Sequence, residues 1–388
     1  MGEWKEYKLG ELGTVVTGKT PSSKNPEDWG DDMFFVTPTD YRNYRKYVDG
    51  SERKLSDIGV KRLANKILPP YSVLVTCIGS DMGKVVITKD PCITNQQINS
   101  IIPNESVDPH FLYYTLINSY DVLRVMGGDG TAVPIVNKRD FENIKIEIPS
   151  LEEQKRIAFI LSSLDDKIDL LHQENKTLEA MAETLFRKWF IEEAKEEWEE
   201  KTLYDCISLV GGGTPKTNNE TYWNGNISWI SGGDISNNHK GYIIDTDKNI
   251  TLEGLNNSST KLLPENAFVI SARGTVGKYC LLSKPMTFSQ SNYGVLPKEH
   301  GCYFFTYLLV SYCVDELQSA AYGSVFDTIT INTFKGINIF IPSEKEIIIF
   351  ENRIKDFFGK IKLNTEQIRE LTTIKELLLL RLMSNTND

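Results

Sequence analysis

Polar, aromatic loops in the first part of the chain contain side chains suited to binding a nucleic acid. They are Thr37-Pro-Thr-Asp-Tyr-Arg-Asn-Tyr-Arg-Lys-Tyr47 and Thr94-Asn-Gln-Gln97. Arginine and asparagine form bidentate hydrogen bonds with the edges of guanine and adenine, and basic side chains contact phosphates. A solvated surface loop is the alternative interpretation. The candidates are Thr37, Thr39, Tyr41, Arg42, Asn43, Arg45, Lys46, Lys84, Gln96 and Gln97.

A second set of such residues occurs further along the chain, at matching positions. Its main loop is Ser231-Gly-Gly-Asp-Ile-Ser-Asn-Asn-His-Lys240, and Ser289-Gln-Ser-Asn292 adds further amides. The candidates in this set are Ser231, Asp234, Asn237, Asn238, His239, Lys240, Arg273, Lys278, Gln290 and Asn292.

Motifs that suggest catalysis lack an essential residue. Leu68-Pro-Pro-Tyr71 is similar to the Asn-Pro-Pro-Tyr of adenine methyltransferases, but Leu68 stands where the asparagine must be. The glycine turns Gly79–Lys84 and Gly274–Lys278 are too short for a phosphate-binding loop, and no Ser or Thr follows either lysine. We therefore interpret these segments as turns and expect no catalytic residue and no cofactor in this chain.

Cysteine and histidine spacing argues against a metal site. The six cysteines form no Cys-x-x-Cys pair, and none of the four histidines lies at ligand spacing from a cysteine or another histidine. We expect ordinary reduced thiols.

Charge and hydropathy limit the classes of protein that remain. The net charge is −10, and most of the acidic excess lies in residues 151–200, with fourteen acidic and seven basic side chains. The acidity argues against wrapping of DNA by the whole surface, but it permits local basic surfaces. No apolar run approaches the ~20 residues that span a bilayer, and the first residues contain no apolar signal region. We expect a cytoplasmic protein without a membrane segment.

The chain repeats itself once. Trp4 recurs as Trp198 and Trp29 as Trp223, both at a shift of 194 residues, and Phe141 recurs as Phe334 at a shift of 193. Such a constant shift indicates a tandem duplication. We predict domains at residues 1–150 and 196–343, each followed by a long helix, at 151–195 and 344–388.

Each large domain is predicted to be a mixed α+β globule. Short apolar runs separated by turn residues predict strands, and one amphipathic helix is expected in each copy, at 110–126 and 304–322. The predicted strands are Phe34–Val36, Val73–Ile78, Val85–Thr88, Ile98–Ile102 and Ile144–Ile148.

The segments after each globule have the apolar pattern of a coiled coil. Residues recur in alternating steps of four and three from Ile157 to Trp189, and again from Phe350 to Leu382. An amphipathic helix packed on its own globule is the alternative. Ser150 and Ser343 are predicted N-caps, with Glu153 and Glu346 completing capping boxes.

The polar residues in these two patterns predict how the helices pair. An antiparallel register in which paired positions sum to 539 places Asn175 opposite Asn364, so that neither amide is buried alone. In the same register Lys375 lies opposite Leu164, and its ammonium must extend outward to solvent. The predicted fold is therefore α+β, with two pseudo-symmetric domains separated by a long antiparallel two-helix coiled coil.

These features together resemble the specificity (HsdS) subunits of Type I restriction–modification systems. The similar segments are Trp4…Leu9…Thr20-Pro21…Trp29, Trp198…Leu203…Gly213-Thr214-Pro215…Trp223, Ile270-Ser-Ala-Arg-Gly-Thr-Val-Gly-Lys278 and Ile148-Pro-Ser-Leu-Glu-Glu-Gln-Lys-Arg-Ile157. The resemblance covers the whole chain. Two departures are that the first domain has no equivalent of Arg273 and that Pro342-Ser-Glu-Lys-Glu-Ile347 lacks the Gln-Lys-Arg of the first copy.

The resemblance implies a subunit that reads double-stranded DNA through two target-recognition domains. Its loops differ although their flanks align, which favours an asymmetric target in two parts, with the spacing set by the helices. The implied partners are two methyltransferase (modification) subunits and restriction/translocase subunits. S-adenosylmethionine, ATP and Mg are implied only for those partners. A recognition subunit of a stand-alone methylation or Type II-like complex and a duplicated scaffold that does not bind DNA are the alternatives.

Overall fold

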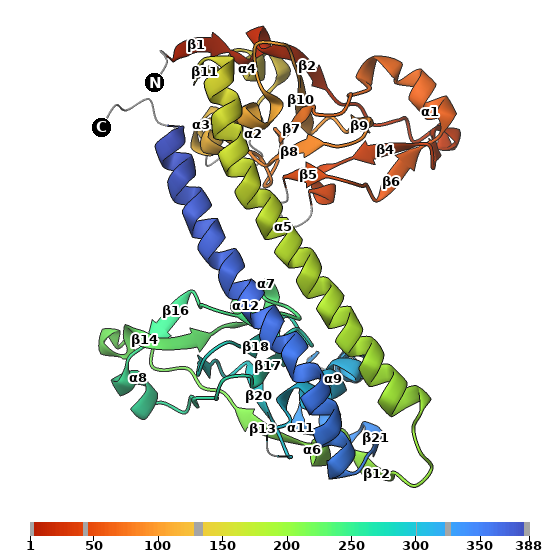
Figure 1. Cartoon of the computed structure of the whole chain (residues 1–388), viewed down its shortest axis with the longest axis vertical. Helices are drawn as coiled ribbons and strands as arrows, with labels where there is room; N and C mark the ends of the chain where they lie inside the picture. Colours follow the sequence, from red (N-terminus) through yellow and green to blue (C-terminus); the bar gives the residue numbers. More distant parts are fainter. Residues whose placement is uncertain (1–3, 42–45, 128–134, 300, 323–326, 384–388) are drawn as a thin grey trace. The chain divides into compact units, whose positions relative to one another are not determined.

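The computed structural model describes residues 4–41, 46–127, 135–299, 301–322 and 327–383. The chain divides into two compact units, unit 1 from residues 1–169 and 370–388 and unit 2 from residues 170–369. Each unit contains one mixed α+β domain together with a segment of α5 (Leu151–Arg187) and a segment of α12 (Glu344–Leu382). The predicted fold class is confirmed in the repeated domains and the two long helices (Figure 1).

Unit 1 is built around a five-stranded sheet of order β2-β10-β7-β8-β5 and a four-stranded sheet of order β3-β6-β4-β9. β1 pairs with β11 beside α5. The strands are β1 (Lys5–Lys8), β2 (Gly13–Thr17), β3 (Trp29–Gly30), β4 (Met33–Val36), β5 (Tyr47–Val48), β6 (Arg53–Leu55), β7 (Val73–Thr76), β8 (Val85–Thr88), β9 (Cys92–Thr94), β10 (Ile98–Pro103) and β11 (Lys145–Ile148). The helices are η1 (Leu9–Glu11), η2 (Pro26–Asp28), η3 (Pro38–Asp40), α1 (Asp57–Arg62), η5 (Ala64–Lys66), α2 (Pro109–Asn118), α3 (Tyr120–Met126) and α4 (Lys138–Glu142).

Unit 2 repeats this topology, except that one strand, β14, takes the place of β3 and β4. Its five-stranded sheet has the order β13-β20-β17-β18-β15, and its second sheet has the order β16-β14-β19. The strands are β12 (Glu199–Thr202), β13 (Ile207–Gly211), β14 (Trp223–Ile230), β15 (Tyr242–Ile243), β16 (Lys248–Ile250), β17 (Phe268–Ser271), β18 (Tyr279–Leu282), β19 (Thr287–Phe288), β20 (Asn292–Pro297) and β21 (Asn338–Ile341). The helices are η6 (Lys188–Glu192), α6 (Leu203–Cys206), η7 (Glu220–Tyr222), α7 (Gly232–Asn237), α8 (Leu252–Asn256), α9 (Tyr303–Tyr312), α10 (Val314–Tyr322) and α11 (Ile331–Lys335).

The strands follow the apolar patterns of the sequence. All four residues of β7 and all four of β17 are buried, as expected for short apolar runs at the centre of a sheet. In β11, exposed and buried residues alternate, because one face of this strand packs on the core of unit 1.

The single helix predicted in each domain is wrong, because each is two short helices. The first divides at Ser119, where φ is −91° and ψ is 13°. The Ser119 hydroxyl donates to the Thr115 carbonyl at 2.8 Å, a contact that bends helices. The second divides at the equivalent Cys313, with φ −87° and ψ 0°.

The two long helices begin differently. At α12 the capping box is complete: the Ser343 amide donates to Glu346 at 3.0 Å, and the Glu346 amide donates to the Ser343 hydroxyl at 3.4 Å. At α5 only the second of these bonds forms, from the Glu153 amide to Ser150 at 3.4 Å. The predicted box at Ser150 is therefore incomplete, because the Glu153 carboxylate binds Arg156 instead.

In unit 2, the α5 and α12 segments pair in the antiparallel register that the asparagines predict. Asn364 Nδ2 donates to Asn175 Oδ1 at 2.9 Å, and Glu174 accepts from the same nitrogen at 2.9 Å. The rings of Trp189 and Phe350, which also sum to 539, lie 5.5 Å apart.

In unit 1, the two helix segments also run antiparallel to each other. Leu378 and Leu382 pack on the core that contains Ile157 and Leu161. The Lys375 ammonium donates to Asp165 at 2.8 Å, so it is paired with a carboxylate rather than simply extended to solvent.

The α12 helix also packs on the α+β domain of unit 2. Its apolar pattern therefore serves both a pairing with α5 and the packing of an amphipathic helix on a globular domain. Phe358 stacks on Phe304 of α9, with ring centroids 4.5 Å apart. The buried Glu351 carboxylate accepts the Phe304 amide at 3.1 Å and the Phe305 amide at 2.7 Å. This side chain therefore caps the first turn of α9 from a different helix.

Replacing Asn364 or Asn175 by leucine is expected to lower the free energy of unfolding by about 1–3 kcal/mol, because each single change removes the hydrogen bond between the two buried amides. Changing both is expected to lower it by less than the sum of the single changes. Urea unfolding measures all three variants. Asn352→Leu, at an exposed position of α12, is the control and should shift stability by less than about 0.5 kcal/mol. Additive single changes would contradict the pairing.

The stability of unit 2 is expected to depend on Glu351. Burial raises the pKa of this carboxyl from 4.5 to about 7, even though two amides donate to it. A pKa raised on folding adds stability below about pH 4.5, and this contribution is lost as the pH rises through about 7. Between pH 5 and 8 the native chain should therefore lose up to roughly 3 kcal/mol relative to Glu351→Gln. Urea unfolding across this range tests it, and parallel pH profiles would refute it.

Candidate nucleic-acid interface

In unit 1, backbone hydrogen bonds bring four loops together at one edge of the sheets. The turn at residues 94–97 lies in the middle. The Lys19 amide donates to the Thr94 carbonyl at 2.8 Å, the Asn95 amide donates to Val36 at 3.1 Å, and the Cys77 amide donates to Gln97 at 2.7 Å. We call the loops that contain residues 18–24, 37–41, 77–84 and 94–97 the loop cluster of unit 1.

Unit 2 has the same loop cluster, formed by residues 212–218, 231–240, 272–278 and 289–292. The equivalent bonds run from Gly213 to Phe288 at 3.0 Å, from Ser289 to Ile230 at 2.9 Å, and from Ala272 to Ser291 at 3.0 Å. The structure therefore brings together, within each unit, candidates that lie up to about 60 residues apart in sequence.

A buried aspartate holds the second loop of each cluster. Asp40 Oδ2 accepts the Thr37 amide and hydroxyl, both at 2.8 Å, and its Oδ1 accepts the Glu52 amide at 2.7 Å. In unit 2, Asp234 Oδ2 accepts the Ser231 amide at 2.8 Å and the hydroxyl at 2.6 Å, and its Oδ1 accepts the Asp247 amide at 3.1 Å. Asp234 and the side chains of Thr37 and Ser231 thus shape the loops from within.

Two candidates of unit 1 lie in its interior. Tyr41 is 6% exposed and belongs to the core. Lys46 is 5% exposed, its ammonium donates to Ser162 of α5 at 2.5 Å, and burial lowers its pKa. Neither side chain can contact a ligand without rearrangement. Arg42, Asn43 and Arg45 lie outside the described residues.

The remaining candidates of unit 1 are at the surface but have partners within it. Thr39 shares a 2.8 Å hydrogen bond with Thr37. Gln96 accepts the Thr20 hydroxyl at 2.7 Å, and Gln97 accepts the Asn95 amide nitrogen at 2.9 Å. The Lys84 ammonium lies 2.5 Å from the Asp81 carboxylate, which neutralises it locally.

Several candidate side chains of unit 2 also make contacts within the protein. Asn238 Nδ2 donates to the Asp234 carbonyl at 2.8 Å, and the buried Asn292 donates to Ser289 at 2.8 Å. His239 lies edge-on to Tyr279, and burial together with nearby Lys278 lowers its pKa, so the imidazole is neutral at pH 7. The Lys240 ammonium lies 3.8 Å from Glu183.

Four candidates of unit 2 remain available for a ligand. Asn237, Arg273 and Gln290 are exposed, and Lys278 is half-buried. Within the part of the chain that the structure describes, none of these four side chains makes a hydrogen bond or an ion pair. Such side chains can bind an external partner without first breaking a contact.

A polar cavity of about 430 Å³ lies beside this loop cluster within unit 2. Basic and acidic side chains both line it: Arg187, His239, Lys240, Lys278, Glu183 and Asp315. Nearby, burial and the neighbouring Glu183 raise the pKa of Glu179 to about 7.

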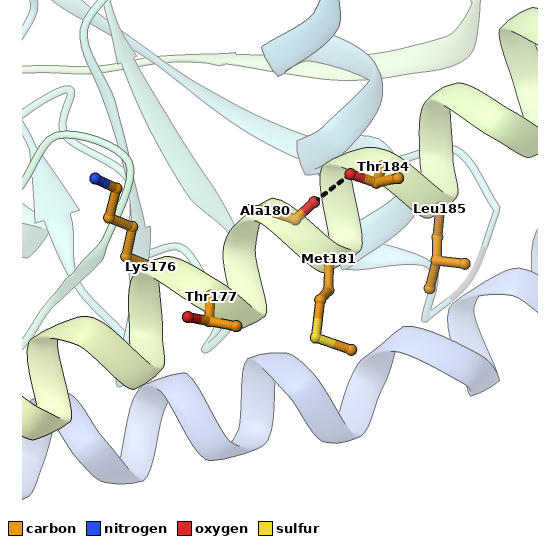
Figure 2. A pocket seen from close by; sticks show the side chains of 6 residues that line it. All are labelled: Lys176, Thr177, Ala180, Met181, Thr184 and Leu185. Carbon is orange, nitrogen blue, oxygen red and sulfur yellow. Dashed lines mark hydrogen bonds between the residues drawn. The ribbon is translucent and has the colours of Figure 1, made fainter.

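Residues of α5 in unit 2 also line a more apolar groove of about 550 Å³. Figure 2 shows Met181, Leu185 and Thr177 projecting from the same side of this helix, with Thr184 bonded to the Ala180 carbonyl at 2.7 Å. Met181 is 46% exposed. No charged residue other than Lys176 lines the groove.

Across the described ranges, no group of three or more His, Cys, Asp or Glu side chains could hold a metal ion. No helix there is long and apolar enough to span a membrane. All six cysteines are free thiols.

A family model described as the Type I restriction modification DNA specificity domain matches the chain twice, at residues 1–180 and 195–373. The chain therefore belongs to the family of Type I restriction–modification specificity subunits, which the sequence resemblance predicted.

Particular relatives extend over the whole chain. It is 28% identical to the Type I restriction enzyme MjaIX specificity subunit of Methanocaldococcus jannaschii, with 98% of this chain and 93% of the relative covered. It is 24% identical to the HindI specificity subunit of Haemophilus influenzae, with 99% of both covered. The fold is similar to that of the Type I system S subunit from M. genitalium, at a TM-score of 0.64 and 15% identity over 100% of this chain and 97% of that one.

The candidate loops of each unit lie together, but the residues that shape a loop and the residues that are free have similar side chains in the sequence. For the two aspartates, the sequence does contain a pattern that indicates their structural role. Thr37-x-x-Asp40 and Ser231-x-x-Asp234 both have the spacing of a capping box, and they coincide in the repeat.

Asp234→Ala is expected to lower the free energy of unfolding by about 1–3 kcal/mol, because the Ser231 and Asp247 amides lose their acceptor. Asn237→Ala, on the same helix but exposed, should change it by less than about 0.5 kcal/mol. Thermal unfolding compares the two. Equal stability of both variants would show that the carboxylate does not hold the loop.

Proposed function

We propose that this chain reads an asymmetric, two-part target in double-stranded DNA, one part with each loop cluster. The observation that carries the proposal is the repetition of one loop scaffold with different exposed side chains, in a member of a DNA-specificity family. Equal scaffolds with unlike surfaces suit two domains that share a binding geometry and differ in the bases they read.

The surfaces of the loop clusters supply both kinds of contact that such reading needs. Exposed arginine and amide side chains can hydrogen-bond to base edges, while lysines and loop amides can contact phosphates. In unit 2 these roles fit Arg273, Gln290 and Asn237 for bases and Lys278 for phosphate. In unit 1, Gln96, Gln97 and Thr39 are at the surface, and Lys84 supplies a weaker charge beside Asp81.

We further propose that the chain itself performs no catalysis. It directs two modification subunits that carry S-adenosylmethionine, and restriction/translocase subunits that use ATP and Mg. The groove around Met181 and the acidic excess of residues 151–200 support protein contacts there, because a mainly apolar helix surface with acidic flanks suits a protein partner better than phosphate.

Replacing residues 1–150 by the corresponding domain of another family member is expected to change one part of the methylated sequence and to leave the other part unchanged. The reason is that each loop cluster is built within one unit. Methylome sequencing of cells that contain the chimera and its modification subunits reads both parts. The reciprocal replacement of residues 196–343 is the matched control and should change the other part.

A chimera that alters both parts, or neither, would contradict independent reading. Methyl transfer by the purified chain alone would contradict its non-catalytic role. Absence of salt-dependent binding to random-sequence duplex DNA by the assembled complex would favour a scaffold that does not bind DNA.

A further inference from the structure

The hairpin between β7 and β8 in unit 1 and that between β17 and β18 in unit 2 are structural equivalents. The Gly83 amide donates to Thr76 at 2.8 Å, and the Gly277 amide donates to Ser271 at 2.9 Å. The Cys77 and Ala272 amides make the matching bonds to the turns at 94–97 and 289–292. These bonds align Ile78 with Arg273 and Lys84 with Lys278.

The side chains at these aligned positions differ in chemistry. Ile78 stands in a β-bridge with Ile135, whereas Arg273 is exposed and makes no hydrogen bond or ion pair within the described residues. Unit 1 also has an additional residue, Asp81, which pairs with Lys84 at 2.5 Å. Its counterpart hairpin in unit 2 has no acidic residue between Arg273 and Lys278.

The hairpin of unit 2 is open to a large ligand. Gly274 follows Arg273 with φ +78°, and a Cβ placed there would meet no atom within 4 Å. A side chain in this conformation would be strained, and the bare backbone leaves room for close approach. On the adjoining turn, the exposed Gln290 precedes Ser291, whose carbonyl accepts the Ala272 amide at 3.0 Å. Arg273 and Gln290 therefore flank one backbone hydrogen bond.

An unpaired, exposed guanidinium beside an open turn has the chemistry to read guanine. Its fork of N–H donors matches the O6 and N7 acceptors in the major groove, and this pair is the commonest specific contact between proteins and DNA. A lysine on the same hairpin can bind a neighbouring phosphate as a point charge.

We propose that Arg273 determines a guanine in the part of the target read by unit 2, with Lys278 anchoring the adjacent phosphate. Unit 1 makes no such contact from this hairpin, because Ile78 replaces the arginine and Asp81 neutralises the lysine. This inference rests on the proposed function, since it assumes that the loop clusters face DNA.

The test selects preferred duplexes from a random-sequence library with the full chain, assembled with its modification subunits. Native protein should select a guanine at one position of one half-target. Arg273→Ala should lose this preference by roughly 5- to 150-fold at that position and leave the other positions unchanged. Arg273→Lys should keep binding to random DNA but lose most of the discrimination, because an ammonium lacks the paired donors.

Lys278→Ala is the matched control on the same hairpin. It should weaken binding to all sequences by a similar factor, keep the selected sequence and lower the salt dependence by about one ion. Thermal unfolding of each variant confirms that these exposed changes leave the fold intact.

Three results would overturn the inference. An unchanged preference in Arg273→Ala would show that another residue reads the base. A uniform loss of affinity in that variant, with the sequence kept, would make Arg273 a phosphate contact. No selected sequence from the native complex would instead refute the proposed function itself, which the first two results would leave standing.

Discussion

A buried carboxylate that accepts three hydrogen bonds is the interaction on which each loop cluster depends. Asp40 and Asp234 both accept an amide and a hydroxyl from the residue three positions earlier, and an amide from a later segment. An unpaired carboxylate would be costly at this depth, so the loop keeps its path whatever side chains point outward. This constraint explains how loops of unlike sequence can begin from the same geometry in both units.

The polar side chains between the two long helices are also paired. Asn364 donates a hydrogen bond to Asn175 in unit 2, and the Lys375 ammonium donates one to Asp165 in unit 1. A shift of one heptad would bury each of these groups against apolar side chains, whereas purely apolar seams would tolerate the shift. The polar residues therefore specify the register. Each unit also takes one segment from each helix: unit 2 is continuous in sequence, whereas unit 1 combines residues 1–169 with residues 370–388.

Repetition and periodicity made most of the fold predictable. The constant shift between Trp4 and Trp198 revealed two copies, and the heptad steps together with the two asparagines gave the direction and register of the helices. Local backbone geometry was less predictable: the apolar pattern continues through Ser119 and Cys313, where the helices divide. The candidate site was predictable as a set of loops but not residue by residue. Tyr41 and Lys46 have the composition of a binding loop, and only tertiary packing shows that they face the interior.

A side chain that reads a DNA base must first give up any contact that it makes within the protein. The candidate side chains of the two loop clusters differ in this respect. In unit 1, hydrogen bonds and an ion pair occupy Gln96, Gln97 and Lys84, so binding through these three side chains must exchange existing contacts for new ones. In unit 2, Arg273 and Gln290 are exposed without such contacts among the described residues. Because forming a contact is less favourable when another must first be broken, Arg273 and Gln290 are better placed to make strong base-specific bonds than Gln96, Gln97 and Lys84. An overall charge of −10 does not oppose this, since much of the acidic excess lies in residues 151–200, outside both loop clusters.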